Sequence, residues 1–249
     1  MSSATFHFHG NLGELLAVPH KNGTVEYSLL RRASVKDIIE ALGVPHTEVA
    51  GLAAGDKGID FSFIVRDQDL IHVLAPCPPV DVCTPTLLRP EPLPVIRFLA
   101  DANVAKLGRL LRMAGFDVLN GKDRDDAGLA ELAAEEGRIM LTRDRLLLRR
   151  KKVVFGRLVR AEDPHAQLRE VVEFYGLTSR LVPFSRCMVC NGLLEPVARE
   201  QILHRLEPLT RKYYQVFRRC RECDRLYWAG SHRQGMERVL QELTTATRG

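Results

Sequence analysis

The chain has 249 residues, of which 45% are hydrophobic and 27% are charged, and its formal net charge is +5. This composition is too apolar for a disordered chain, and at about 150 residues per domain the length favours one to two domains. The sequence has no apolar run of about eighteen residues, which excludes a transmembrane helix and argues against a membrane partner.

The first ten residues, MSSATFHFHG, lack a basic start and an apolar stretch, so we expect no secretory signal and a cytoplasmic location. In a reducing compartment, paired cysteines are more typical of metal binding than of disulfides. The positive charge increases towards the carboxyl end, where residues 180–249 hold 13 basic and 7 acidic side chains. Such a region is typical of chains that hold a polyanion near a metal site, although an ordinary arginine-rich surface has the same composition.

The first 75 residues show the element order of a small β-grasp domain. Apolar and polar residues alternate over 6–9 and again over 25–29, which predicts two strands that form a hairpin. Residues 34–43 predict a helix, with a capping box at Ser34 and Asp37 and a stop at Gly43. Further short apolar runs lie at 49–53, 59–64 and 71–74. Two strands, a helix and further strands are the order of a ubiquitin-like fold.

A proline-rich segment separates this region from the rest of the chain. Residues 75–94, APCPPVDVCTPTLLRPEPLP, hold seven of the thirteen prolines. Proline has no backbone donor and a fixed φ, so we predict a semi-rigid linker over 76–94. The expected domains are then 1–75, 95–179 and 180–249.

Beyond the linker, short apolar strands alternate with helices, the pattern of a parallel α/β sheet. Helices are predicted from Val104, over 125–136, and from Asp163-Pro164 to about Tyr175. No glycine-rich dinucleotide or P-loop motif is present. The predicted strands are 95–100, 116–119, 138–142 and 153–159.

Aspartates follow two of these strands. Asp101 follows the first strand and Asp144 the third, while Asp123, Asp125 and Asp126 lie at the start of the second helix. Because ligands bind beyond the carboxyl ends of parallel strands, we expect these acids at one edge. Gathered carboxylates repel one another unless they bind a hard cation, and Mg²⁺ or Mn²⁺ can then support phosphodiester hydrolysis. Alternatively, each aspartate is only a helix N-cap.

Basic residues lie close to the second of these acids. Arg143 and Arg145 flank Asp144, and Arg149 and Arg150 follow. We predict that these arginines contact the backbone of a nucleic acid, with a solvated basic turn as the alternative.

Two CxxC pairs provide the strongest motif. The pairs CMVC and CREC are separated by 29 residues, and their spacing predicts a tetrahedral structural zinc site with an excursion between the two knuckles. The predicted ligands are Cys187, Cys190, Cys220 and Cys223.

An aromatic and polar run, YWAGSH, follows the second pair. Trp228 is a candidate for stacking on an unpaired base and His232 for a phosphate contact. The alternative is that Trp228 covers the core of the small zinc module. A short helix is expected around Met236 to Leu243.

Several of these motifs occur in the order of a known family. The segments resemble the PIN-like ribonuclease domain named after the carboxyl terminus of the Mut-seven exonuclease, which often ends in a zinc ribbon. SVKDIIEALGVPHTEV is similar to the ubiquitin-like domain that precedes this nuclease domain in many proteins. The segments that resemble the nuclease are VIRFLADANVAKLGRLLRMAGFDVL, DRDDAGLAELAAEEGRIMLTRDRLLL, SRCMVCNGLLEPV and RLYWAGSH.

The resemblance implies a metal-dependent ribonuclease with a PIN fold and RNA as its substrate. Its acidic site would map onto Asp101, Asp126 and Asp144, with Asp125 and Asp163 as additional candidates. Mg²⁺ or Mn²⁺ would bind at these acids, and zinc would bind at the four cysteines. The oligomeric state is undetermined, with a homodimer as one alternative because toxin-like PIN domains often dimerise.

Three hypotheses follow. In the first, the chain is an RNA-cleaving endonuclease whose zinc ribbon grips the substrate. In the second, it is a non-catalytic RNA-binding adaptor in which the aspartates only cap helices. In the third, the β-grasp domain is a docking module that holds a protein partner. The motifs do not distinguish tRNA, rRNA and mRNA as substrates.

Overall fold

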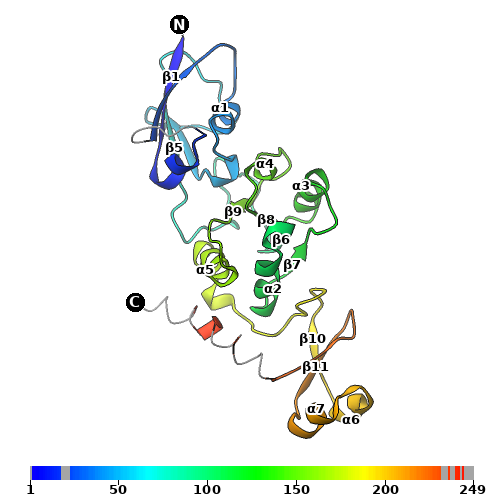
Figure 1. Cartoon of the computed structure of the whole chain (residues 1–249). Helices are drawn as coiled ribbons and strands as arrows, with labels where there is room; N and C mark the ends of the chain where they lie inside the picture. Colours follow the sequence, from blue (N-terminus) through cyan, green and yellow to red (C-terminus); the bar gives the residue numbers. More distant parts are fainter. Residues whose placement is uncertain (1, 18–22, 231–234, 236–238, 242, 244–249) are drawn as a thin grey trace.

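The computed structural model describes residues 2–17, 23–230, 235, 239–241 and 243. Three β-sheets follow one another along the chain, and the central sheet lies between the other two (Figure 1). No helix in these described ranges is long and apolar enough to cross a membrane.

The amino-terminal sheet is a five-stranded β-grasp sheet in the order β2-β1-β5-β3-β4. Its first and last strands, β1 and β5, pair in parallel at the centre, as the predicted fold requires. The capping box of Ser34 and Asp37 starts the helix α1, whose buried residues pack on the sheet. The elements are β1 (Ser3–Phe8), β2 (Thr24–Ser28), α1 (Val35–Ala41), β3 (Gly51–Ala54), β4 (Lys57–Gly58) and β5 (Leu70–Leu74).

One strand prediction in this region was wrong. The apolar run 59–64 contributes only an isolated bridge between Ile64 and Ser34. The Asp60 carboxylate accepts hydrogen bonds from the backbone N–H and the hydroxyl of Ser62, which folds the run into a turn. The strand is instead β4, two residues long.

The central sheet has four parallel strands in the order β7-β6-β8-β9, which confirms the predicted parallel α/β arrangement. On one face, α2 and α5 pack together over the sheet. On the other face, buried residues of α3 and α4 belong to the same hydrophobic cluster as those of the β-grasp sheet. The elements are β6 (Phe98–Ala100), α2 (Ala105–Met113), β7 (Val118–Asn120), α3 (Asp126–Glu135), β8 (Ile139–Thr142), α4 (Arg145–Leu148), β9 (Gly156–Leu158) and α5 (Pro164–Phe174).

The proline-rich segment is packed and is not an extended spacer. Val82, Leu88 and Leu93 are buried. The Arg89 guanidinium donates hydrogen bonds to carbonyl oxygens of the β-grasp region, including that of Val49, and to a carbonyl before β9. This segment therefore joins the first two sheets and does not hold them apart.

The carboxyl-terminal sheet is antiparallel, in the order β10-β11-β12. The excursion between the CxxC pairs contains two short helices. The helix expected around 236–243 lies mostly outside the described residues, although Leu240 and Leu243 are buried against the central core. The elements are β10 (Leu194–Val197), α6 (Arg199–Ile202), α7 (Pro208–Tyr213), β11 (Phe217–Cys220) and β12 (Leu226–Trp228).

Candidate active site and metal centre

The two aspartates that follow β6 and β8 meet in one hydrogen-bond network. The hydroxyl of Thr142 donates to Asp101 Oδ2 at 2.7 Å and accepts from the backbone N–H of Asp144 at 2.9 Å. The side-chain amide of Asn103 donates to the same Asp101 oxygen at 2.6 Å and to the Thr142 hydroxyl at 3.2 Å. Because Thr142 is fully buried, this network fixes the carboxylate of Asp101 and the backbone of Asp144 relative to the sheet.

Both aspartates also cap short helical turns. Asp101 Oδ1 accepts from Ala102 N at 2.5 Å, at the start of the 3₁₀ turn Ala102–Val104. Asp144 Oδ1 accepts from Leu146 N at 2.7 Å, at the start of α4. The capping interpretation and the active-site interpretation therefore do not exclude each other, since a capped carboxylate is held in a defined orientation.

The other predicted acids lie outside this network. Asp125 caps α3 through Gly128 N at 2.9 Å, and Asp126 lies 3.5 Å from Arg150 Nη2. Asp163 caps α5, and the backbone hydrogen bond from Ala166 lowers its pKa. Asp123 is exposed in the loop before α3.

The acids do not form a compact ligand set of three. Throughout the part of the chain that the structure describes, the four cysteines are the only group of three or more Cys, His, Asp or Glu side chains whose ligand atoms already lie close enough together to hold one ion. Mg²⁺ needs only one or two carboxylates, with water and substrate phosphate completing its octahedron. The oxygen donors of Asp101 and Asp144 at neighbouring strand ends fit that requirement.

Two of the predicted nucleic-acid contacts lie at the boundary with the β-grasp region. Arg145 Nη1 donates to the carbonyl oxygen of Leu15 at 2.9 Å, and Arg149 Nη2 donates to that of Gly43 at 2.8 Å. These hydrogen bonds brace α4 against the β-grasp sheet. Arg143 is more exposed and lies 3.7 Å from Glu162. A role for these arginines in RNA binding stays a prediction.

The four predicted zinc ligands converge. Their sulfur atoms all lie within 4.8 Å of one another, with Cys187 and Cys223 at 3.6 Å and Cys190 and Cys220 at 3.4 Å. Zinc–sulfur bonds of about 2.3 Å in a tetrahedron separate the sulfurs by about 3.8 Å, so the cluster fits one zinc ion. Four thiolates leave no open coordination position, which suits a structural site.

The first cysteine knuckle is bound to the amino edge of the central sheet. Asn191 Oδ1 accepts from Val118 N at 3.0 Å, and Asn191 Nδ2 donates to Asp117 Oδ1 at 2.9 Å. The buried Arg112 of α2 donates to the carbonyl oxygens of Val118 and Val189. The cysteine cluster therefore lies at the edge opposite to Asp101 and Asp144, which follow the carboxyl ends of their strands.

Two known domain families match the chain. The Mut7-C RNAse domain matches residues 96–240, more than half of the chain, and the Mut7-C ubiquitin domain matches residues 1–79. The chain belongs to the Mut7-C RNAse domain family. The resemblance seen in the sequence is confirmed, and the family is one described as a ribonuclease domain. No curated protein and no solved structure matches the chain.

Sequence reasoning missed several residues around the carboxyl edge of the Mut7-C RNAse domain. Thr142 and Asn103 join the two aspartates, and a polar residue two positions after Asp101 was the available signal. Exposed cations also surround this edge. These cations are Lys106, Arg109, Lys122 and Arg124. Within the described ranges, none of them forms an ion pair with a carboxylate.

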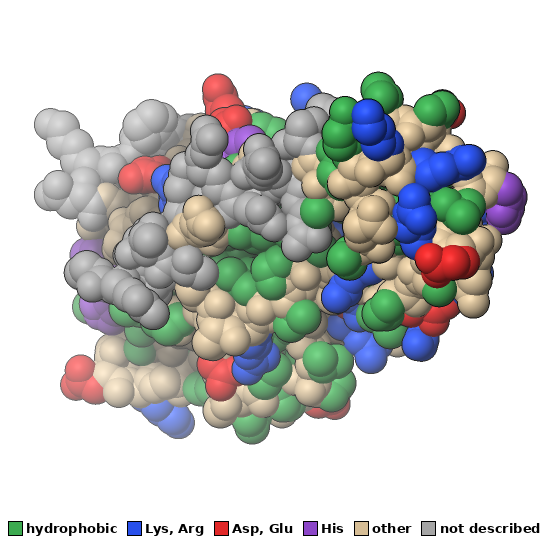
Figure 2. All heavy atoms as spheres, turned by 90° about the horizontal axis from the view of Figure 1, so that it is seen from below, with side chains coloured by type: hydrophobic (Ala, Val, Ile, Leu, Met, Phe, Trp, Pro, Cys, Tyr) green, Lys and Arg blue, Asp and Glu red, His purple; other side chains and the backbone are tan. Residues whose placement is uncertain are grey.

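The zinc-bearing end of the Mut7-C RNAse domain carries basic and apolar side chains. Figure 2 shows Lys and Arg among hydrophobic side chains at the end of the molecule that carries the carboxyl-terminal sheet and the helices α6 and α7. The Trp228 ring lies 6.4 Å from that of Phe217 and is 40% exposed. Trp228 thus covers part of the small core and also keeps an exposed surface. His232 lies outside the described residues.

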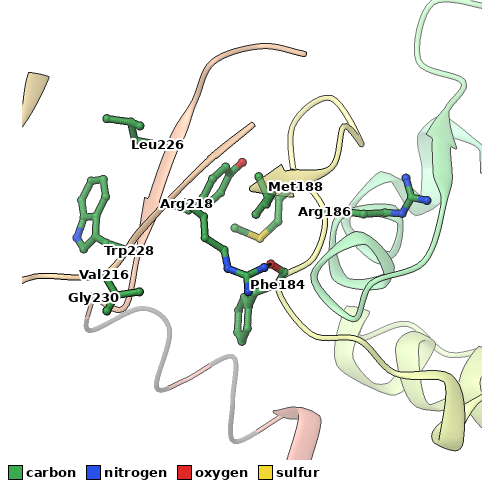
Figure 3. Close-up of a pocket in the computed structure, with 10 residues that line it drawn as sticks. Phe184, Arg186, Met188, Val216, Arg218, Leu226, Trp228 and Gly230 are labelled. Atoms are coloured by element: carbon green, nitrogen blue, oxygen red, sulfur yellow. Dashed lines mark hydrogen bonds between the residues drawn. The ribbon is translucent and has the colours of Figure 1, made fainter. Parts of the chain in front are cut away.

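A hollow of about 230 Å³ lies beside the edge strand β12. Trp228 lies on one side of this strand, while Arg218, Phe184 and Met188 lie on the other (Figure 3). Alternation along the strand explains the separation, since Tyr227 is the cross-strand partner of Arg218. The indole and the guanidinium therefore do not face each other across this hollow.

Proposed function

We propose that the chain is a metal-dependent ribonuclease that hydrolyses phosphodiester bonds of RNA, by endonucleolytic cleavage, at the edge formed by Asp101 and Asp144. One observation carries the proposal: the buried hydroxyl of Thr142 donates to the carboxylate of Asp101 and accepts from the backbone N–H of Asp144, so the two aspartates lie at adjoining strand ends. Both residues lie within the segment 96–240 that matches the Mut7-C RNAse domain, which supports the proposal.

Asp101 and Asp144 would hold Mg²⁺ or Mn²⁺. Such an ion, when bound, lowers the pKa of water and stabilises charge on the leaving oxygen. Thr142 and Asn103 hold the Asp101 carboxylate in one orientation, so the oxygen donors need not reorganise when substrate binds. Asp126, Asp125 and Asp163 are further candidate acids, each at the start of a helix on the same edge.

Helix α2 offers an RNA path between the two ends of the domain. It starts directly after the Asp101 turn and ends beside Arg112, which binds the zinc knuckle. Its nine residues span about 14 Å, roughly the length of two nucleotides. Lys106 and Arg109 are exposed one turn apart on this helix. RNA could therefore bind at the aspartates, follow these cations and reach Trp228 on the zinc ribbon.

We assign the domains as 1–75, 95–179 and 180–249, with 76–94 between the first two. The ubiquitin-like domain would brace the active edge, because it accepts hydrogen bonds from both Arg145 and Arg149. Its outer sheet face remains available for a protein partner.

Incubation of labelled single-stranded and structured RNA with the purified chain tests the proposal. Cleavage that requires Mg²⁺ or Mn²⁺, stops with EDTA and disappears in the D101N/D144N variant would support it. The folded state of the variant is checked by thermal unfolding. Salt-sensitive RNA binding without cleavage under any metal would instead support the adaptor hypothesis.

A further inference from the structure

Three histidines lie together on the outer face of the β-grasp sheet, far in the sequence from the nuclease residues. His7 is on β1, His9 directly follows β1, and His72 is on β5. Their neighbours Phe8, Ile71 and Val73 are buried, because alternate side chains of a strand point to opposite faces. The three imidazoles therefore share the face that is not covered by α1.

The strand register brings these side chains into contact. His7 and His72 are direct partners in the parallel β1–β5 pair, and His9 N donates to the carbonyl oxygen of Val73, which extends the pairing by one residue. The His72 ring is 5.5 Å from the His7 ring and 5.2 Å from the His9 ring. On its other side His72 is paired with Ala53, which is too small to cover the imidazole.

The two nearest nitrogens have the spacing of two ligands on one ion. His9 Nε2 and His72 Nδ1 are 3.0 Å apart. Two nitrogens bound at about 2.1 Å with an angle of about 90° are separated by about 3.0 Å, the arrangement of tetragonal Cu²⁺ and Ni²⁺ sites. The same contact is a hydrogen bond when one of these nitrogens carries a proton; with the protons on His9 Nδ1 and His72 Nε2 instead, both facing nitrogens present lone pairs to an ion.

His7 can supply a third nitrogen. Its Nδ1 lies 2.9 Å from the Thr24 hydroxyl, a contact of the kind that sets the tautomer of ligating histidines and leaves Nε2 for a metal. In the structure the His7 ring stacks on His72, with an interplanar angle of 19°. Rotation of this ring is therefore required before three nitrogens converge, and rotamer changes of accessible side chains are fast.

We propose that His9 and His72, joined by His7, form a binding site for a late first-row divalent metal ion such as Ni²⁺ or Cu²⁺. The site is separate from the zinc ribbon, whose ligands are thiolates, and from the carboxylates of the nuclease edge. It does not depend on the proposed ribonuclease function. Solvent can occupy the remaining positions, because His9 is exposed and His7 and His72 are partly exposed.

Equilibrium dialysis of the untagged, zinc-loaded full chain against NiCl₂ tests the site, with nickel and zinc measured in the same sample by mass spectrometry. Ni²⁺ is the probe because Cu²⁺ also oxidises thiolates. We expect one Ni²⁺ per chain with the zinc content unchanged. The H9A and H72A variants should each raise the Kd for Ni²⁺ at least tenfold, and H7A should raise it less.

His204, an exposed histidine on the zinc-bearing end, provides the matched control, and H204A should bind Ni²⁺ like the wild type. Circular dichroism checks that each variant is folded. The side chains of His9 and His72 point away from the core. Wild-type protein that binds no Ni²⁺, or H9A and H72A variants that bind as tightly as H204A, would overturn the proposal.

Discussion

Glu48 of the ubiquitin-like domain and Arg157 of β9 form an ion pair of 2.7 Å in which the two side chains are only 1% and 8% exposed. Glu48 also accepts a hydrogen bond from Leu158 N at 2.8 Å. Burial raises the pKa of Glu48, although the charge of Arg157 and the Leu158 hydrogen bond act in the opposite direction. The cost of desolvating the two charges therefore offsets much of the attraction between them. The pair fixes the relative position of the two domains more than it adds to the free energy of unfolding.

Breaking this pair should destabilise the chain strongly. In the E48Q variant the buried Arg157 keeps its charge, and Glu170, at 3.0 Å, is its remaining carboxylate partner among the described residues. We expect a loss of about 3 kcal/mol in the free energy of unfolding. The E48L/R157M double variant should lose less, because the two most deeply buried charges are removed together and Glu170 keeps hydrogen bonds from the backbone N–H groups of Arg160 and Ala161. Urea unfolding of the three proteins measures both effects.

The Glu14–Arg160 pair gives the control for this experiment, because it joins the same two domains at the surface. Its separation is 3.2 Å and Glu14 is 73% exposed. E14Q should change the unfolding free energy by less than about 1 kcal/mol. Equal losses of unfolding free energy in E14Q and E48Q would contradict the expectation that burial makes the Glu48–Arg157 pair more costly to break.

The element order and the metal ligands were predictable because they depend on local patterns. Alternation, capping residues and the CxxC spacing are read from neighbouring residues, and α1, α3, α5 and the cysteine cluster all follow them. The short helix α4 was missed because four residues carry too little periodicity. The run 59–64 was misread because the carboxylate of Asp60 competes for its backbone N–H groups.

Contacts between distant segments were not predictable in this way. The neighbour Asp144 predicts RNA contacts for Arg145 and Arg149, and these stay a prediction. No local pattern indicates that both arginines also donate to the carbonyl oxygens of Leu15 and Gly43, more than a hundred positions away. The zinc ribbon lies at the amino-terminal ends of the central strands, and this position likewise depends on a distant contact, the hydrogen bond from Val118 N to Asn191 Oδ1. Such pairings are set by tertiary packing and leave no local signal.

The hydroxyl of Thr142 should be needed for RNA cleavage. T142V keeps the shape of the side chain and removes the bond to Asp101 Oδ2 and the acceptor for Asp144 N. Losing such a buried hydrogen bond costs about 1–3 kcal/mol, so we expect kcat to fall roughly tenfold to hundredfold. T142S retains the hydroxyl and should keep most of the activity. A T142V enzyme as active as T142S would show that the network does not position the aspartates.

Loss of one cysteine ligand should release zinc and loosen the ribbon selectively. Cys223 is exposed, so C223S leaves no cavity in the core, but it removes one of four ligands. We expect the zinc content to fall from one ion per chain towards zero and amide exchange to rise over 187–228, with the central sheet still protected. C77S, an exposed cysteine outside the cluster, is the control and should retain zinc. Zinc retention by C223S would contradict the four-cysteine site.

The exposed cations of α2 should carry part of the RNA affinity and of its salt dependence. Lys106 and Arg109 lie between the aspartate edge and the zinc ribbon, and each phosphate contact on a single strand contributes about 0.7 to the slope of log affinity against log salt. K106A/R109A should therefore weaken binding of single-stranded RNA and lower that slope by about 1.4. Fluorescence anisotropy at several salt concentrations measures both quantities. K57A, a change at an exposed lysine of β4, removes one positive charge far from α2 in the fold and should have little effect. An unchanged slope in K106A/R109A would place the RNA on another face of the domain.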